Sequence, residues 1–141
     1  MTERVPSDHA AVDSHRVRLE TVGRTGRPRV PLPDAFDHTA GDVLRLSLEG
    51  IEAHAQVTAD LRGEPGIESA HPDAQLARTG EGENRLAAWV DRHGLGAGDP
   101  LLVDVVTPGY QYGLRRPGER VVYDAVEAPD DGLADIAEQF G

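Results

Sequence analysis

The sequence predicts a mainly β fold with short helices: a partly open barrel of about seven strands built from two similar halves, plus a C-terminal amphipathic helix. Two observations predict the barrel. A cassette of loop, apolar segment, Ala-Gly-Asp and strand occurs twice, and short alternating segments separated by Gly and Pro run through most of the chain. A length of 141 residues is consistent with one domain and a single core.

Each copy of the cassette runs from a Thr-Gly loop to a Gly-Asp pair and then into an alternating strand, over 43–48 in the first copy and 101–106 in the second. The Gly permits the positive φ of a turn, and the Asp accepts backbone N–H groups that hold the turn in place. We therefore interpret both pairs as structural turns of equivalent halves. The residues concerned are Gly41, Asp42, Gly98 and Asp99.

In the first half, residues 1–15 are polar and aperiodic, which predicts a flexible N-terminal extension. Alternation from Arg16 onward predicts a half-buried strand, and a Gly-rich arm follows it. The next strand carries Pro31 and Pro33, which lack amide donors, so we expect it to be short or at a sheet edge. Further strands are expected over 43–48 and 52–58.

In the second half, short strands are expected over 67–70 and 74–77. Asn84 is the expected cap of a helix whose apolar stripe includes Leu86 and Trp89, and Trp89 is interpreted as a core residue. Gly94 is the expected terminator of this helix. Three strands, over 101–106, 110–114 and 121–126, then complete the barrel.

The expected organisation is therefore a flexible extension over 1–15, a barrel domain over 16–126, and an acidic C-terminal helix over 127–141. The helix is predicted because Leu133, Ile136 and Phe140 share one helical face after an Asp-Asp cap. This apolar face is a candidate surface for a protein partner or for a second copy of the chain.

The composition is strongly acidic, with 25 Asp and Glu against 14 basic residues, and every basic residue is Arg. The net charge of −11 without any Lys resembles the composition of halophilic proteins, which work in molar salt where the Debye length is about 3 Å. There is no Cys, so disulfides and thiolate metal sites are excluded. Neither a membrane-spanning run nor a signal-like N-terminus is present, which predicts a cytoplasmic protein without a membrane partner.

The positive charge is concentrated in two segments. Residues 16–29 hold five Arg against one Glu, a local charge of +4, and residues 115–120 hold three Arg against one Glu, a local charge of +2. The first segment includes the Gly-rich arm. Such arginines either form a nucleic-acid contact or simply balance nearby carboxylates.

Sequence motifs for catalysis or metal binding are missing. The six His residues have no metal-ligand spacing, and the chain contains neither a P-loop nor a nucleophile elbow. We therefore expect a non-enzymatic protein without metal or cofactor.

The second cassette, from Asn84 to Asp99, continues through a strand to a Tyr-Gln-Tyr-Gly-Leu-Arg-Arg segment ending at Arg116. This order resembles the DNA-binding pseudobarrel superfamily, which includes the DNA-binding domain of plant auxin-response-type transcription factors and the effector domain of some restriction endonucleases. The resemblance covers about 100 residues, from Arg16 to Arg116. The whole chain also resembles an uncharacterised haloarchaeal protein family, which implies no activity.

The superfamily resemblance implies double-stranded DNA as the partner and two arms that grip its major groove. Carried over by position, the first arm contains Arg24, Thr25, Arg27 and Arg29, and the second contains Arg78, Thr79, Asn84 and Arg85. The second arm departs from the pattern, because Glu81 and Glu83 stand where phosphates would approach.

Tyr112, Arg115 and Arg116 are additional candidates, since a Tyr beside Arg offers a stacking surface for a base. The alternative is that the tyrosines are half-buried residues of the barrel. The function predicted first is therefore DNA binding, with transcription regulation as a possible role. The alternative function is a non-enzymatic protein-interaction barrel of the swapped-hairpin or double-psi type, which binds through the C-terminal helix or the acidic surface.

Overall fold

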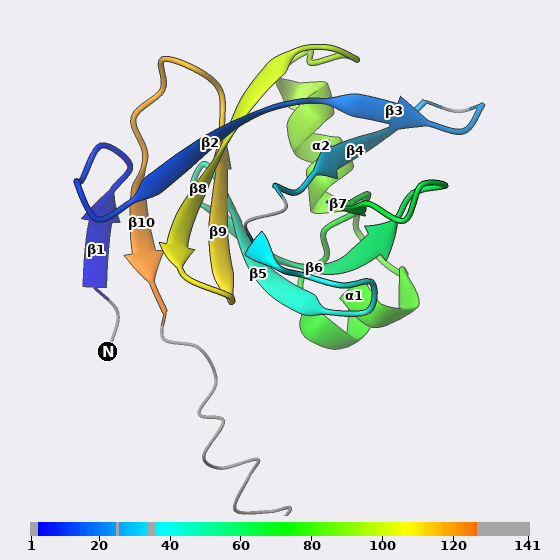
Figure 1. Ribbon diagram of the computed structural model, residues 1–141, viewed down its shortest axis with the longest axis horizontal. Coiled ribbons are helices and arrows are strands. Elements are labelled where there is room, and N and C mark those ends of the chain that lie inside the picture. The colour runs from blue at the N-terminus through cyan, green and yellow to red at the C-terminus, as the bar shows by residue number, and fades with distance from the viewer. Residues whose placement is uncertain (1–2, 25, 34–35, 127–141) are drawn as a thin grey trace, which may run out of the picture.

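The computed structural model describes residues 3–24, 26–33 and 36–126 (Figure 1). Strands dominate these residues, and the two helices are short. The elements in chain order are β1 (Glu3–Pro6), β2 (Asp13–Arg18), β3 (Glu20–Val22), β4 (Arg27–Pro31), β5 (Val43–Leu48), β6 (Ile51–Ala59), β7 (Pro65–Ile67), α1 (Ala74–Thr79), α2 (Arg85–Arg92), β8 (Pro100–Thr107), β9 (Gln111–Arg115) and β10 (Val122–Ala125).

Eight of these strands form one sheet in the order β2-β8-β9-β5-β6-β7-β4-β3. Its two end strands, β2 and β3, are consecutive along the chain and separated only by Leu19, which is buried. One long strand therefore pairs with β8 in its first part and with β4 in its second part. This strand brings the two ends of the sheet together, so the sheet forms the nearly closed barrel expected from the sequence.

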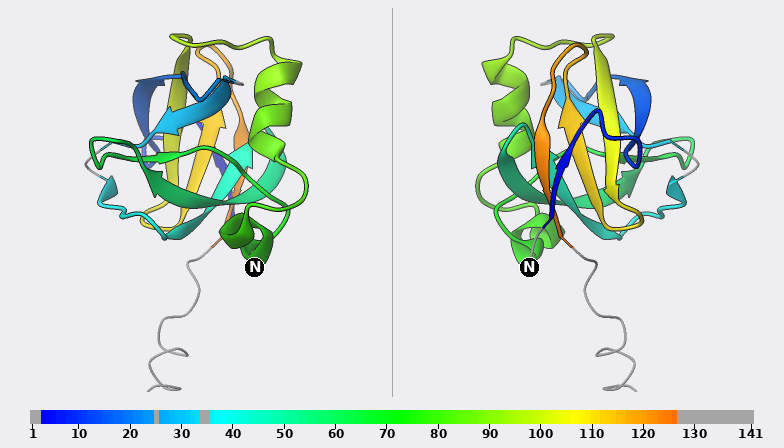
Figure 2. Two further views of the ribbon diagram at one scale, coloured as in Figure 1. Left: turned by 90° about the vertical axis from the view of Figure 1, so that its right-hand side faces the viewer. Right: turned by 90° about the vertical axis from the view of Figure 1, so that its left-hand side faces the viewer.

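The core fills the inside of this barrel. Strand alternation directs Leu44, Leu46 and Leu48 of β5 inward, and all three are buried. Helix α2 runs along the side of the barrel (Figure 2). It inserts Leu86 and Trp89 into the same core, which confirms the predicted apolar stripe.

The two Gly-Asp turns are built alike. Asp42 accepts the amide of Thr39 through Oδ2, and Asp99 accepts the amide of Gly96 through Oδ2, at 3.1 Å and 2.7 Å. Both glycines have positive φ, 101° at Gly41 and 89° at Gly98. Each turn opens a hairpin, β5–β6 or β8–β9, and the parallel pairing of β5 with β9 joins the two hairpins in one sheet. The turn and the hairpin after it are therefore repeated in the fold, whereas a helix precedes only the second turn among the described residues.

Of the segment 67–70, expected as a strand, only Ile67 lies in one, at the end of β7. Three further local expectations were wrong. The segment 74–77, expected as a strand, lies in α1, because Asp73 caps the amide of Leu76 and Gly80 ends the helix in the left-handed conformation. The N-terminal segment is not a loose extension where it is described, since β1 pairs with β10 and β2 begins at Asp13.

The third wrong expectation concerns β10. This strand was expected in the barrel and instead forms a two-stranded sheet with β1 (Figures 1 and 2). Tyr123 of β10 is buried over Gly113 of β9, and its hydroxyl donates to Asp104 of β8. These contacts fix the small sheet to the barrel wall. The predicted C-terminal helix over 127–141, with Leu133, Ile136 and Phe140, lies outside the described residues.

Candidate nucleic-acid interface

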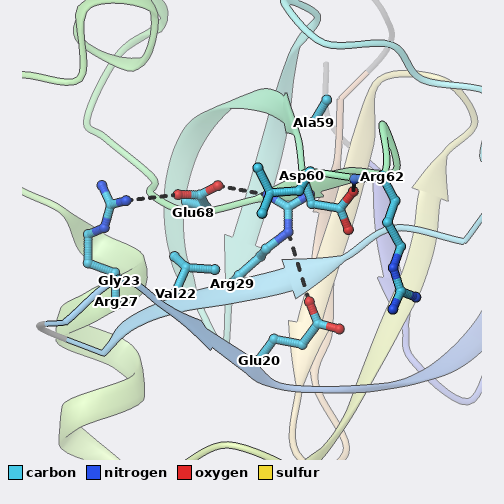
Figure 3. Close-up of a pocket in the computed structure, with 10 residues that line it drawn as sticks. Glu20, Val22, Gly23, Arg27, Arg29, Ala59, Asp60, Arg62 and Glu68 are labelled. Atoms are coloured by element: carbon cyan, nitrogen blue, oxygen red, sulfur yellow. Dashed lines mark hydrogen bonds and ion pairs between the residues drawn. The ribbon is translucent and has the colours of Figure 1, made fainter.

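A groove of about 500 Å³ opens between two hairpins of the barrel. The β3–β4 hairpin forms one wall, and the turn between β6 and β7 forms the other (Figures 1 and 3). In the β3–β4 hairpin, Glu20 pairs across the strands with Arg29 and Val22 pairs with Arg27, so these four side chains share the face that lines the groove. The other lining residues are Gly23, Ala59, Asp60, Leu61, Arg62 and Glu68.

Arg29 lies inside the protein beneath this groove, with a side chain that is 2% exposed. One terminal nitrogen donates to Thr58 Oγ1 at 2.9 Å and to Glu68 Oε2 at 2.8 Å. The other donates to the carbonyl oxygens of Thr58 and Glu64, at 3.3 Å and 2.9 Å. These bonds tie β4 to β6 and to the segment after it, so Arg29 fixes the two walls of the groove relative to each other.

Arg29, predicted as part of the first DNA-contacting arm, is therefore buried beneath that arm rather than exposed on it. Its charge is compensated by Glu68, whose side chain is 23% exposed, and its terminal donors are all engaged within the protein. Its Nε–H group alone has no hydrogen-bond partner among the described residues. That nitrogen lies 3.9 Å from Glu20 Oε1, on the groove side.

Exposed arginines stand at the mouth of the groove. Arg24 is exposed at the tip of the β3–β4 hairpin, and the side chain of Arg27 is 62% exposed beside it. Arg62 is exposed on the opposite turn. The ion pair of Arg27 with Glu68, at 3.4 Å, is a partly exposed contact of a kind worth about 0–1 kcal/mol, so Arg27 is readily released to a ligand. Thr25, also predicted for this arm, lies outside the described residues.

The turn that carries Arg62 is held by Asp60. Its Oδ1 accepts the amides of Arg62 and Glu64, at 2.8 Å and 2.9 Å. These backbone N–H groups, that of Glu64 first, lower the pKa of Asp60 because they stabilise the carboxylate. The fixed turn presents Leu61 and Arg62 to solvent, and Leu61 is fully exposed.

The groove lining is balanced in charge. Arg27, Arg29 and Arg62 supply three positive charges, and Glu20, Asp60 and Glu68 supply three negative charges. Arg24 at the hairpin tip adds one positive charge at the rim. Glu64, exposed in the β6–β7 turn, adds one negative charge there. The groove and its rim are therefore neutral within a chain whose net charge is −11.

The four residues predicted for the second arm lie elsewhere. Asn84 uses Oδ1 to accept the amides of Ala87 and Ala70, and so caps α2. Arg85 donates to the carbonyl oxygen of Glu52 at 2.6 Å and to the Glu83 carboxylate at 3.3 Å. Arg78 and Thr79 are exposed at the end of α1, where Thr79 Oγ1 donates to the carbonyl of Leu76.

None of these four second-arm residues lines the groove. Helix α1 lies across the molecule from the β3–β4 hairpin in Figures 1 and 2. The two sets of arginines predicted to act together, Arg24 with Arg27 and Arg78 with Arg85, are thus not gathered at one groove.

The remaining candidates are structural. Tyr112 is 1% exposed, stacks on Phe36 with ring centroids 4.7 Å apart, and shares a 2.7 Å hydrogen bond with His38 Nε2. Burial raises the pKa of Tyr112. Arg115 donates to the buried Asp104 carboxylate at 2.6 Å. The stacking interpretation is therefore wrong for Tyr112, and the barrel-core alternative is correct.

Arg116, the last of these candidates, is one-third exposed and pairs with Glu49 and Glu119, at 3.3 Å and 3.2 Å. Glu49 also accepts the indole N–H of Trp89 at 2.7 Å. Arg116 is therefore part of a polar cluster that holds α2 against the barrel.

Of the residues that line the groove, only Arg27 and Arg29 were predicted as site residues, and the charged residues missed are Glu20, Asp60, Arg62 and Glu68. The Asp60-to-Gly63 segment has the composition of a turn, but no local sequence pattern indicates that this turn folds beside the Gly-rich arm. That neighbourhood follows from the short β4–β7 pairing, in which Val30 faces Ile67.

The described residues do not include a group of three or more His, Asp or Glu side chains placed to hold a metal ion. Neither described helix is long and apolar enough to cross a membrane. What the described residues do define is a small β barrel with an arginine-bearing groove between two hairpins.

The chain belongs to a family described as "Family of unknown function (DUF7112)", which it matches over residues 1–140. Neither the curated proteins nor the solved structures gave a match to the chain.

Proposed function

We propose that this protein binds double-stranded DNA through the β3–β4 hairpin and the groove beside it. The observation that carries the proposal is the placement of three exposed arginines, Arg24, Arg27 and Arg62, on two hairpins that flank one groove. Arginine is well suited to phosphate and guanine, because its planar guanidinium donates two parallel hydrogen bonds.

The shape of the hairpin suits this role. The major groove of B-DNA is about 12 Å wide and admits a two-stranded β-ribbon. The tip of the hairpin contains Gly23 and Gly26, both at positive φ, 73° and 68°, so the ribbon turns without a bulky side chain on these residues. Arg29 fixes the base of the ribbon, which reduces the ordering cost of binding.

In this account the protein is a cytoplasmic, cofactor-free DNA-binding member of the pseudobarrel superfamily in a halophile, and transcription regulation is its proposed role. The resemblance of the second cassette supports the superfamily assignment. The acidic remainder of the chain repels DNA at low salt, and molar salt screens this repulsion within about 3 Å.

The test is a fluorescence-anisotropy titration of a labelled random-sequence duplex pool with wild type and with the double variant Arg24→Ala/Arg27→Ala. Loss of at least about tenfold in affinity is expected, since each phosphate or base contact is worth about 1–3 kcal/mol. The matched control is Arg92→Ala/Arg120→Ala, which removes the same charge from exposed residues outside the groove. Equal losses in both double variants would mean that the hairpin has no specific role.

A protein partner is the second candidate function, and one observation favours it. Leu61 is fully exposed beside a groove whose charges balance, a combination suited to a peptide that carries both signs of charge. The partner surface predicted from Leu133, Ile136 and Phe140 remains a proposal for the C-terminal segment. If the wild-type protein binds no duplex at any salt concentration, the protein-partner function is favoured.

A further inference from the structure

The Nε–H of Arg29 is a buried donor that lacks an acceptor within the described part of the chain. Leaving a buried donor unpaired costs about 1–3 kcal/mol, and more when the group is charged. The other four N–H groups of the same guanidinium are directed at oxygen atoms 2.8 to 3.3 Å away. The missing bond is therefore a local exception in an otherwise well-satisfied site, and it lies on the groove side.

Glu20 covers this donor without bonding to it. Its Oε1 is 3.9 Å from Arg29 Nε, which is beyond hydrogen-bond distance, and its side chain is 53% exposed (Figure 3). Glu20 also sits directly opposite Arg29 in the β3–β4 ladder. A carboxylate in this position contributes charge balance but is free to rotate into solvent.

We propose that Glu20 occupies the binding site of a DNA phosphodiester. On binding, the phosphodiester displaces Glu20 and accepts the Nε–H of Arg29. This inference rests on the proposed DNA binding and adds a defined phosphate subsite to it. The phosphodiester carries one negative charge, as Glu20 does, so the exchange keeps the cluster of Arg27, Arg29, Glu68 and the bound anion neutral. Arg27 and Arg62, on the two walls of the groove, flank this binding site.

The displacement makes Glu20 a built-in competitor of the ligand. Because both anions compete for one cationic donor, neutralising Glu20 strengthens DNA binding. Glu20→Gln keeps the size of the side chain and removes its charge, and the expected gain is about three- to tenfold in duplex affinity. Glu64→Gln is the matched control, because Glu64 loses the same charge in the nearby turn but its carboxylate does not line the groove.

The first readout is the anisotropy titration of wild type, Glu20→Gln and Glu64→Gln with the duplex pool, with thermal melts to show that each variant is folded. The second is the NMR signal of the Arg29 Nε–H group in protein labelled with ¹⁵N-arginine. We expect this signal to shift on addition of duplex. We also expect Glu20→Gln to bind DNA more tightly, while Glu64→Gln remains within about twofold of wild type.

Three results would overturn the subsite. One is equal affinity of Glu20→Gln and wild type while Arg24→Ala/Arg27→Ala still loses binding, which leaves the DNA function intact. Another is a shift of the Arg29 signal with inorganic phosphate but not with duplex, which would mean that the site binds a free anion and not DNA. The third is a wild-type protein that binds no duplex at all, which removes the proposed function and the subsite together.

Discussion

The guanidinium of Arg29 lies directly over the backbone of Gly66. A Cβ atom at residue 66 would stand 2.7 Å from Arg29 Cζ, closer than side chains pack in proteins. Arg29 has no easy alternative position, because its four terminal hydrogen bonds tie it to Thr58, Glu64 and Glu68. Gly66 is therefore required by a neighbouring side chain rather than by its own φ angle.

Gly66→Ala is expected to destabilise the protein by about 1–3 kcal/mol, the usual cost of overpacking a buried site. The control is Gly96→Ala, where an added Cβ meets nothing within 4 Å. Urea denaturation of the two variants compares their free energies of unfolding. A loss in Gly66→Ala no larger than that in Gly96→Ala would show that the Arg29 position is adaptable.

Trp89→Ala is expected to cost about 3–5 kcal/mol, since it empties a large space in a core where Trp89 is 1% exposed. Trp89→Phe retains most of the volume but leaves Glu49 without its indole donor, so a smaller loss of about 1–3 kcal/mol is expected. Thermal denaturation in molar KCl measures both. A loss below about 1 kcal/mol for the alanine variant would contradict the core position.

The fold was predictable where the signal is local. The Gly-Asp turns, the Asn84 cap and the strands on either side follow from short motifs and alternation, and the structure confirms them. Helix α1 was missed because its six residues are too few to show a period, and only the Asp73 cap and Gly80 mark it. The pairing of β1 with β10 joins residues more than 100 positions apart, which no local pattern encodes.

Asp42 makes the stability depend on pH. The amide of Thr39, and then the hydrogen bond with His38, lower the pKa of Asp42 in the folded protein. A carboxyl with a lower pKa in the folded state contributes stability above its unfolded pKa of about 3.9 and loses it as the pH falls through the folded value. The free energy of unfolding is therefore expected to fall below about pH 4.

Asp42→Asn isolates this contribution, since other carboxylates, Asp60 among them, behave in the same direction. The difference in unfolding free energy between wild type and Asp42→Asn should shrink as the pH is lowered from about 5 to 2, because the protonated wild-type carboxyl has lost its charge. A difference that stays constant with pH would mean that the Asp42 charge does not stabilise the turn.

Gly113→Ala is expected to displace Tyr123, because an added Cβ would overlap the Tyr123 ring. Tyr123 attaches the β1–β10 sheet to the barrel, and its hydroxyl bonds to the buried Asp104. Hydrogen exchange should therefore show lost protection in β1 and β10 with retained protection in β5 and β8. Unchanged exchange in β1 would show that the small sheet is held by other contacts.

The candidate site was predictable only in part. The Arg-rich arm was visible as local charge, and Arg24 and Arg27 are exposed there. The burial of Arg29 was not visible, because its partners Thr58 and Glu68 lie about 30 to 40 residues away in sequence. Charge alone does not distinguish an exposed arginine from one that is buried and fixes the scaffold.

Salt dependence of duplex binding tests the proposed DNA contact most directly. Gel-shift titrations of the random-sequence duplex pool are made from about 0.2 to 2 M KCl. We expect a protein–DNA complex across this range. Because the acidic surface repels phosphates until salt screens it, affinity should fall less steeply with KCl than for a basic protein, or rise at first. A wild-type protein that retains no DNA at any of these salt concentrations would contradict the proposed function.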